Sequence, residues 1–227
     1  MAINHADLEV IADIDKSKYI WILDTRFFIA RDQSLNDLDW NATHERAGEQ
    51  NLFMSPPSLF FPHYLNTRDA AQGKSTLYDA YGHPLSKSTA GKVWKDLSTD
   101  CWIWLDALFK RKKKLVLETD HRVGQQTKGK DVISFSTYRT SPLERCVKED
   151  NVLVDLASFN NQGFPTRKSK EQDYSRGDNL YFYEPQEDCV AGFGADSVRA
   201  FLSCGRDPRG SDASLGVLLC AEGVQRK

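Results

Sequence analysis

The apolar residues of this chain fall mostly into short β-prone runs, and this grouping limits the folds open to it. The runs are rich in Val, Ile, Leu, Tyr and Phe, and turn-forming or charged residues bound them. Such runs are typical of strands. We therefore expect strands at residues 19–23, 27–30, 115–117, 132–135, 152–154 and 180–183.

One stretch has the periodicity of a helix. Its apolar residues recur at three- or four-residue spacing, at Trp94, Leu97, Cys101, Leu105 and Leu108. This spacing puts one apolar stripe along a helix and predicts a helix over residues 91–109. Trp102 and Trp104 lie beside the stripe, where we expect them to pack against a sheet. Several strands with few helices indicate the α+β class.

Other parts of the chain predict irregular structure. Residues 33–91 show no dominant period and contain several prolines, so we expect long ordered loops held in place by aromatic anchors. Residues 159–178 are polar and include an Asn-Asn-Gln-Gly sequence, which predicts a surface loop. The chain is long enough for one large core. We therefore expect a single domain over residues 1–227, with a loop-rich part at residues 1–90.

Charge and hydropathy exclude further classes of protein. The 30 Lys and Arg against 32 Asp and Glu give a net charge of -2, too little positive charge to hold a polyanion, so no nucleic-acid partner is expected. The basic residues 110–114 follow the predicted helix, and we interpret them as its solvated C-terminal end. No run approaches the roughly 18 apolar residues of a membrane span, so we expect no membrane insertion. Residues 1–7 lack the features of a signal peptide, which predicts synthesis in the cytoplasm.

Motifs for metal, disulfide or catalytic chemistry are missing from the sequence. The five cysteines are an odd number without a C-x-x-C pair, which argues against a disulfide framework and a structural zinc site. Glu118, Asp120 and His121 stand almost side by side in the sequence, but neighbours on a strand point apart, so we interpret them as a polar turn. We expect no metal and no cofactor.

The segment at residues 188–222 carries the most specific pattern. Arg199 precedes Pro208 by nine residues, and Leu215-Gly216 begins seven residues after Pro208. With these separations the segment resembles the closing stretch of the formylglycine-generating-enzyme-like branch of the C-type lectin fold. The resemblance implies a C-type-lectin-like α+β domain with short strands, one or two amphipathic helices and much irregular structure.

The same resemblance argues against an enzyme. The oxidases of that branch carry two cysteines within this segment, and Ala195 and Ala200 stand in their places here. A methyl group can neither form a thiolate nor bind a metal. The resemblance therefore implies a protein without that oxidase chemistry.

Within this fold, the segment is most similar to the variable proteins of diversity-generating retroelements, found in phages and archaeal viruses. Those proteins combine fixed framework residues with positions that tolerate nearly any residue. The similarity implies a framework of Arg199, Ala200, Pro208, Leu215 and Gly216, in which Arg199 should be buried and bonded to backbone carbonyls. It implies a variable, ligand-binding set of Gly192, Phe193, Gly194, Asp196, Ser197, Leu202, Gly205, Arg206, Asp207, Arg209, Gly210 and Asp212.

The resemblance implies a non-catalytic protein whose C-terminal face binds a protein or glycan receptor on a target cell. Phe193, Arg206 and Arg209 are the expected anchors, since aromatic and Arg side chains dominate binding energy. We expect such a protein to be incorporated in a virion or displayed on a surface. Two alternatives stay open. One is an enzyme of the same fold that uses Asp120 and His121, and the other is an intracellular binding module of unrelated fold.

Overall fold

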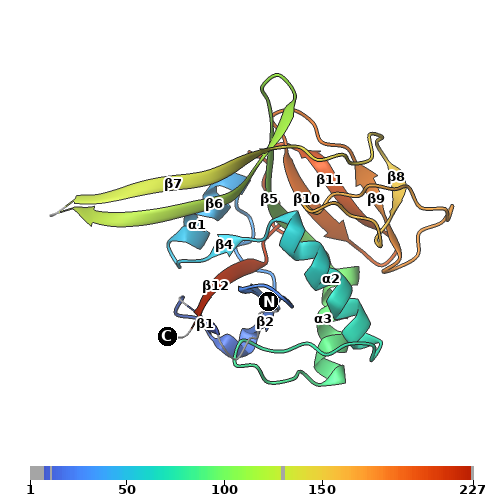
Figure 1. The fold of residues 1–227 in the computed structure, drawn as a ribbon, viewed down its shortest axis with the longest axis horizontal. Coiled ribbons are helices and arrows are strands. Elements are labelled where there is room, and N and C mark those ends of the chain that lie inside the picture. The colour runs from blue at the N-terminus through green and yellow to red at the C-terminus, as the bar shows by residue number, and fades with distance from the viewer. Residues whose placement is uncertain (1–7, 11, 129–130, 226–227) are drawn as a thin grey trace.

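The computed structural model describes residues 8–10, 12–128 and 131–225, and within them it shows an α+β fold (Figure 1), as the sequence predicts. The expectation about a signal peptide concerns residues 1–7, which lie outside the described residues. The helices are α1 (Trp40–Gly48), α2 (Pro57–Ala71) and α3 (Lys87–Thr99), with a short 3-10 helix at Lys16–Lys18. The strands are β1 (Leu8–Val10), β2 (Tyr19–Trp21), β3 (Phe27–Ala30), β4 (Phe53–Met54), β5 (Cys101–Arg111), β6 (Leu115–Lys128), β7 (Asp131–Pro142), β8 (Val152–Asp155), β9 (Asn179–Tyr183), β10 (Val190–Ala195), β11 (Ala200–Arg206) and β12 (Leu219–Gln225).

The smaller, five-stranded sheet brings the two ends of the described chain together. Its order is β1-β12-β3-β2, and β4 also pairs with β12. β1 and β12 are antiparallel, with Leu8 opposite Gln225. The strands expected at residues 19–23 and 27–30 are confirmed as β2 and β3, which pair with Ile20 opposite Ile29.

The larger sheet has seven strands in the order β7-β6-β5-β10-β11-β9-β8. Its pairs are antiparallel except β11 with β9, which is parallel. The four remaining expected strands are confirmed as β8, β9 and parts of the longer β6 and β7. β6 and β7 form a hairpin that extends away from the rest of the molecule (Figure 1). Residues 159–178 join β8 to β9 by turns, bends and isolated bridges, as expected.

The helix predicted over residues 91–109 is wrong in its second half. α3 ends at Thr99, and β5 begins at Cys101. Cys101, Leu105 and Phe109 are spaced by four residues, which places them on one face of either a helix or a strand. They line one buried face of β5, while Trp102 and Trp104 point to the other. The aromatic and β-branched residues between them favour the strand.

The prediction of long loops over residues 33–91 is also wrong, because this stretch contains α1, α2 and the start of α3. The Asp39 carboxylate accepts a hydrogen bond of 2.8 Å from the Ala42 N–H and caps α1. Pro57 occupies the first position of α2, where a proline costs no hydrogen bond, whereas Pro62 lies inside the helix. In the described part of the chain, none of these helices has both the length and the apolar character to cross a membrane.

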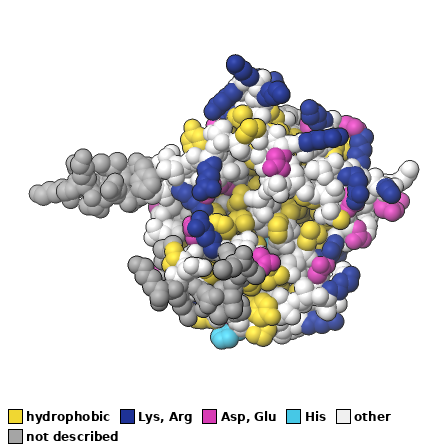
Figure 2. Space-filling view, in the orientation of Figure 1, with side chains coloured by type: hydrophobic (Ala, Val, Ile, Leu, Met, Phe, Trp, Pro, Cys, Tyr) yellow, Lys and Arg dark blue, Asp and Glu magenta, His cyan; other side chains and the backbone are white. Residues whose placement is uncertain are grey.

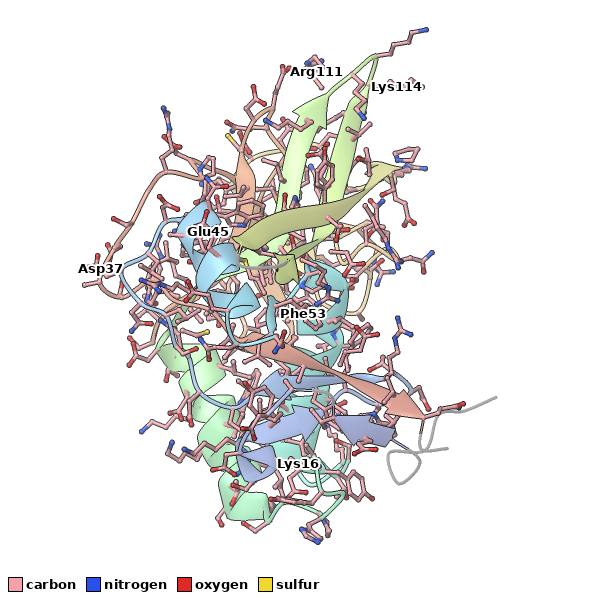
Figure 3. The ribbon with its side chains drawn as sticks, turned by 90° about the vertical axis from the view of Figure 1, so that its left-hand side faces the viewer. Lys16, Asp37, Glu45, Phe53, Arg111 and Lys114 are labelled. Atoms are coloured by element: carbon pink, nitrogen blue, oxygen red, sulfur yellow. The ribbon has the colours of Figure 1, made fainter. Side chains whose placement is uncertain are left out.

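The basic residues 110–114 do not end a helix as interpreted from the sequence, but form the end of β5 and the turn that leads to β6. Figure 3 shows Arg111 and Lys114 at this turn, at the end of the molecule away from Lys16. Lys110 binds Asp188 at 2.7 Å and Arg111 binds Glu187 at 2.6 Å. Figure 2 shows the Lys and Arg side chains of this turn at the top of the molecule, and Asp and Glu side chains interspersed with basic ones elsewhere.

The main core lies between the larger sheet and helices α2 and α3. Phe193 of β10 is fully buried there, and its ring centroid lies 4.8 Å from that of Phe60 and 5.3 Å from that of Tyr64. Residues of α3 such as Val93 and Leu97 join the same cluster. The packing of these side chains fixes β10 in the middle of the sheet.

We expect Phe193→Ala to lower the free energy of unfolding by about 3–5 kcal/mol, because it leaves a cavity in a packed aromatic cluster. Val198→Ala is the control, since Val198 is 71% exposed and its truncation should change stability by less than about 0.5 kcal/mol. Urea denaturation of both variants measures the difference. Equal stabilities of the two variants would contradict the buried position of β10.

Candidate ligand-binding face

The C-terminal segment expected to bind a ligand forms two adjacent strands of the larger sheet. β10 lies between β5 and β11, and β11 pairs on its other edge with β9. Successive residues of a strand point to opposite faces. The inward-facing side chains of this segment are Phe193, Ala195, Ala200, Leu202 and Cys204, and each is at most 1% exposed.

Two residues expected to contact a ligand are therefore core residues. Phe193 packs on the aromatic side chains of α2, and Leu202 is fully buried on the same side of the sheet. Neither side chain is accessible from the surface, so the expectation that they bind a ligand is wrong. The physical reason is that this segment is regular strand, in which every other side chain faces the core, rather than an irregular loop.

The outward face of the same strands carries a group of partly exposed aromatic side chains. Trp102 of β5 and Phe201 of β11 lie with ring centroids 5.3 Å apart in an edge-to-face arrangement. Tyr183 of β9 follows at 6.4 Å from Phe201, and Tyr181 lies beside Phe201 in the strand register. We call these four residues together with Arg206 the aromatic face.

Glycines of β10 let these side chains pack closely against the backbone of the sheet. A Cβ atom added to Gly194 would lie 2.5 Å from Cζ of Phe201 and 3.0 Å from Cε3 of Trp102. One added to Gly192 would lie 2.8 Å from Cδ of Arg206. Both glycines belong to the expected ligand-binding set, and the structure gives them a different role as the floor beneath the aromatic face.

Arg206 extends across this floor, with its guanidinium carbon 5.9 Å from the ring centroid of Phe201 and 5.7 Å from that of Trp104. Burial lowers the pKa of the guanidinium, and the nearby Asp212 carboxylate opposes that shift. Such a cation over aromatic rings is held by the ring quadrupole. Arg206, which the sequence predicts as an anchor, thus lies on the aromatic face.

Arg199 does not have the buried framework position that the family resemblance implies. Its side chain is 53% exposed and lies 3.5 Å from the Asp196 carboxylate, within the turn between β10 and β11. It faces the same side as Phe201, 5.7 Å from that ring. Arg199 therefore gives no support to the lectin-like framework and belongs to the surface around the aromatic face.

The other framework residues do occupy structural positions. Ala200 and Leu215 are buried. The Pro208 carbonyl accepts a hydrogen bond of 3.0 Å from the Trp40 N–H. Gly216 forms a bridge with Ile103 of β5, and a Cβ atom there would lie 2.6 Å from the Ser34 carbonyl oxygen. The chain after β11 thus pairs with β5 at Gly216, and residues 33–36 lie so close to it that only glycine fits.

The remaining expected contact residues lie in surface turns. Asp196 accepts hydrogen bonds from the Val198 and Arg199 N–H groups, and Asp207 pairs with Arg209 at 3.0 Å. Asp212 accepts a hydrogen bond from the Ser214 N–H. These residues do not form the aromatic face, although the Asp212 carboxylate lies near enough to Arg206 to influence its pKa. The set so placed is Asp196, Ser197, Asp207, Arg209, Gly210 and Asp212, whereas Gly205 lies within β11.

Sequence reasoning missed Trp102, Tyr181, Tyr183, Phe201 and Ser203. Residues 200–204 read Ala-Phe-Leu-Ser-Cys, in which only Ser203 is polar, so no apolar–polar alternation marks the outward positions in the sequence. Two shallow hollows lie at this face. One, of about 180 Å³, is lined by Tyr183, Arg199, Phe201, Ser203 and Arg206, and the other, of about 290 Å³, reaches Asn151 and Val198.

The alternative site at Asp120 and His121 is not assembled. Asp120 binds Arg122 at 2.7 Å and Arg139 at 3.0 Å. His121 instead hydrogen-bonds through Nδ1 to the buried carboxylate of Asp106 at 2.6 Å. The two side chains thus have different partners and do not form an acid–base pair.

The chain matches no protein-family model, and no curated protein or solved structure is significantly similar to it.

Gly194→Ala should displace the Phe201 and Trp102 rings and lower stability by about 1–3 kcal/mol through overpacking. Gly91→Ala is the matched control, because among the described atoms none lies within 4 Å of a Cβ added there in α3. This control should stabilise the protein by about 0.5–1 kcal/mol, the helix preference of Ala over Gly. Thermal unfolding followed by circular dichroism compares them, and a neutral Gly194→Ala would argue against the close contact.

Proposed function

We propose that this protein is a non-catalytic binding protein that recognises a protein partner through its aromatic face. The observation that carries the proposal is the arrangement of Trp102, Phe201 and Tyr183 around Arg206 on an open sheet face. Trp, Tyr and Arg are the residue types that dominate the energy of protein interfaces. Their partial exposure leaves apolar area that a partner can bury.

The rigidity of this face supports a binding role. The edge-to-face contact between Trp102 and Phe201 and the glycine floor beneath them restrict both rings before any partner arrives. A side chain that is already ordered loses less conformational entropy on binding, so more of its contact energy becomes affinity. Arg199 and Arg206 add positive charge beside the rings, which suits a partner with exposed carboxylates.

The composition of the face supports a role without catalysis. The side chains on and around it are aromatic rings, guanidinium groups and the Ser203 hydroxyl. Of the carboxylates beside it, Asp196 is occupied by backbone N–H groups and Arg199, and Asp212 by the Ser214 N–H. Ala195 and Ala200, in place of the oxidase cysteines, both point into the core. Side chains at these two positions do not reach the face.

The proposal includes a lectin-like scaffold diversified by a retroelement, with the variable positions redrawn from the burial pattern. Core residues cannot vary freely, because a change of even one methylene in a packed interior is destabilising. Residues that face outward on β11 and on the turn before it can vary freely, because their side chains contact no packed interior. The redrawn variable set is Val198, Arg199, Phe201, Ser203 and Gly205, and the fixed set is Phe193, Ala195, Ala200, Leu202 and Cys204.

Binding is tested by screening the protein against an array of cell-surface protein ectodomains and a separate glycan array. For the strongest hit, we expect Phe201→Ala and Tyr183→Ala to weaken the dissociation constant at least tenfold, about 1.4 kcal/mol or more. Tyr81→Ala is the control, since Tyr81 is 60% exposed and stacks on His83 away from this face. A hit unaffected by both face variants, or glycan hits alone, would refute a protein-binding aromatic face.

Diversification is tested by sequencing around the gene. We expect a reverse transcriptase gene and a near-copy of the codons for residues 188–222 that differs at adenines. The differences should concentrate in codons of the outward set and spare those of the inward set, because only outward residues can change without loss of stability. A neighbourhood without either element would remove the retroelement from the proposal and leave the binding face untouched.

A further inference from the structure

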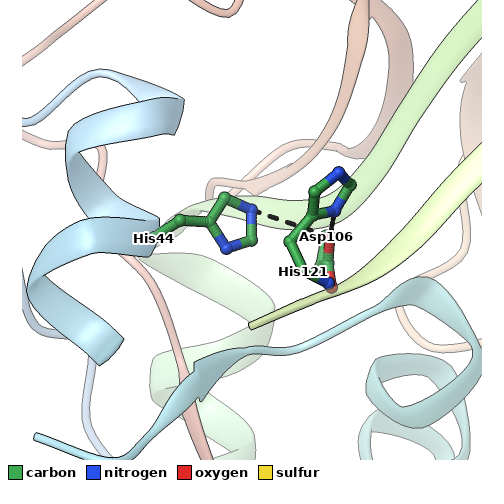
Figure 4. Close-up of side chains that lie close together, drawn as sticks. All are labelled: His44, Asp106 and His121. Atoms are coloured by element: carbon green, nitrogen blue, oxygen red, sulfur yellow. Dashed lines mark hydrogen bonds and ion pairs between the residues drawn. The ribbon is translucent and has the colours of Figure 1, made fainter. Parts of the chain in front are cut away.

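A second cluster of chemically active side chains lies at the junction of α1 with β5 and β6. His44 comes from α1, Asp106 from the middle of β5, and His121 from β6 (Figure 4). One nitrogen from each histidine and one carboxylate oxygen all lie within 4.8 Å of one another. This cluster plays no part in the aromatic face.

The cluster is compact and centred on Oδ1 of Asp106. That atom lies 2.6 Å from Nδ1 of His121 and 3.6 Å from Nε2 of His44. Metal–ligand distances of about 2.0–2.2 Å place neighbouring ligand atoms about 3–3.5 Å apart. The two separations from Oδ1 bracket that range, and the two histidine nitrogens lie within 4.8 Å of each other, so side-chain movements of about 1 Å would bring the three atoms around one ion.

One ring nitrogen of His44 is buried without a hydrogen bond in the described part of the chain. Its side chain is only 5% exposed, and Nε2 has no hydrogen-bond partner among the described residues. Burial lowers the pKa of His44 to about 4 against the opposing pull of Asp106. Histidine binds metals through a ring nitrogen that carries no proton, and this buried nitrogen, aimed at the Asp106 carboxylate, has no hydrogen bond to the described residues that would satisfy it.

The surroundings hold the three side chains in place. The centroid of the Trp40 ring lies 4.2 Å from that of the His44 ring and 5.0 Å from that of the His121 ring, and both contacts are edge-to-face. The other carboxylate oxygen of Asp106, Oδ2, accepts a hydrogen bond of 3.0 Å from the backbone N–H of His121. Ordered ligands of this kind reduce the cost of assembling a metal site.

The local charges permit a cation. The Asp106 carboxylate is fully buried, which is costly unless a positive charge or hydrogen bonds compensate it. Arg122 is the cation nearby, but its guanidinium pairs with Asp120 at 2.7 Å and covers the Phe53 ring. Because Asp120 offsets its charge, Arg122 leaves Asp106 available to an ion.

Access is possible from the side of His121. The His121 side chain is 12% exposed, and Tyr138, which stacks on it at 5.3 Å, is 53% exposed. An ion can therefore enter past a side chain at the surface, and a solvent molecule can complete its coordination. A purely hydrogen-bonded network accounts for His121 and Asp106 but leaves Nε2 of His44 unsatisfied, whereas an ion satisfies all three.

We propose that His44, Asp106 and His121 bind one divalent transition-metal ion, with Zn²⁺ as the ion that suits them best. Two imidazoles and one carboxylate are a donor set for zinc and its neighbours in the first transition series, whereas Ca²⁺ and Mg²⁺ prefer oxygen ligands alone. The bound ion links α1 to β5 and β6.

The test uses the full chain, stripped of metal with a chelator and titrated with ZnCl₂ by calorimetry. We expect one equivalent of Zn²⁺ to bind and to raise the thermal unfolding temperature by several degrees, because an ion that binds only the folded state stabilises it. MgCl₂ and CaCl₂ should do neither. The Co²⁺ form should show visible absorption and an X-ray absorption spectrum of N and O ligands without sulfur, which separates this site from the nearby Cys220.

His44→Gln and His121→Gln should each weaken Zn²⁺ binding at least about tenfold, since each removes a ligand. His63→Gln is the matched control, because His63 is equally buried, in α2, and its Nε2 also has no partner among the described residues. It should bind Zn²⁺ as the unmodified protein does. Circular dichroism of the metal-free variants verifies that they fold. If His44→Gln does not fold, His121→Gln still tests the site, because His121 is the more exposed of the two ligands.

Three results would each overturn the proposal. They are no Zn²⁺ binding by the unmodified protein, binding that survives in the folded His121→Gln variant, and sulfur among the ligands of the Co²⁺ form. None of them bears on the aromatic face, whose test uses different residues and a different readout.

Discussion

The burial of β5 on both faces is the constraint on which the rest of the structure depends. Ile103, Leu105 and Ala107 face α2 and α3, and Trp104 and Asp106 face α1 and the C-terminal chain, all at most 1% exposed. A strand that is buried on both faces needs other elements packed on each side, and its buried polar groups need hydrogen-bond partners. The indole N–H of Trp40 donates to the Leu105 carbonyl and that of Trp104 to the Leu38 carbonyl, which ties α1 and its approach to this strand.

The aromatic face and the His44–Asp106–His121 cluster both follow from this arrangement. Trp102 and Asp106 point to the same side of β5, because their positions differ by four and side chains at even offsets share one face of a strand. At Trp102 the cover is incomplete and the rings stay partly exposed, whereas at Asp106 α1 closes over the strand. One face of one strand thus provides both an open surface suited to a partner and a buried carboxylate suited to a cation.

The bulge in β6 gives the cluster its third member. The register with β7 shifts between Thr119 and Arg122, and Asp120 there adopts a φ of 59°. Asp is among the few residues that tolerate this left-handed conformation. The extra residue turns Asp120 outward to the arginines and His121 inward to Asp106, so neighbours in sequence have separate environments.

The sequence alone determined the α+β class, the positions of β2, β3, β8 and β9, and the irregular connection before β9, because these depend on local composition and short-range pattern. It could not separate helix from strand at residues 101–109, since a four-residue spacing satisfies both periods. It also could not show that Phe193 and Leu202 face the core. Only the tertiary structure decided these points and brought His44, Asp106 and His121 together, because contacts between distant residues depend on strand register, the β6 bulge and the docking of α1, which no local pattern encodes.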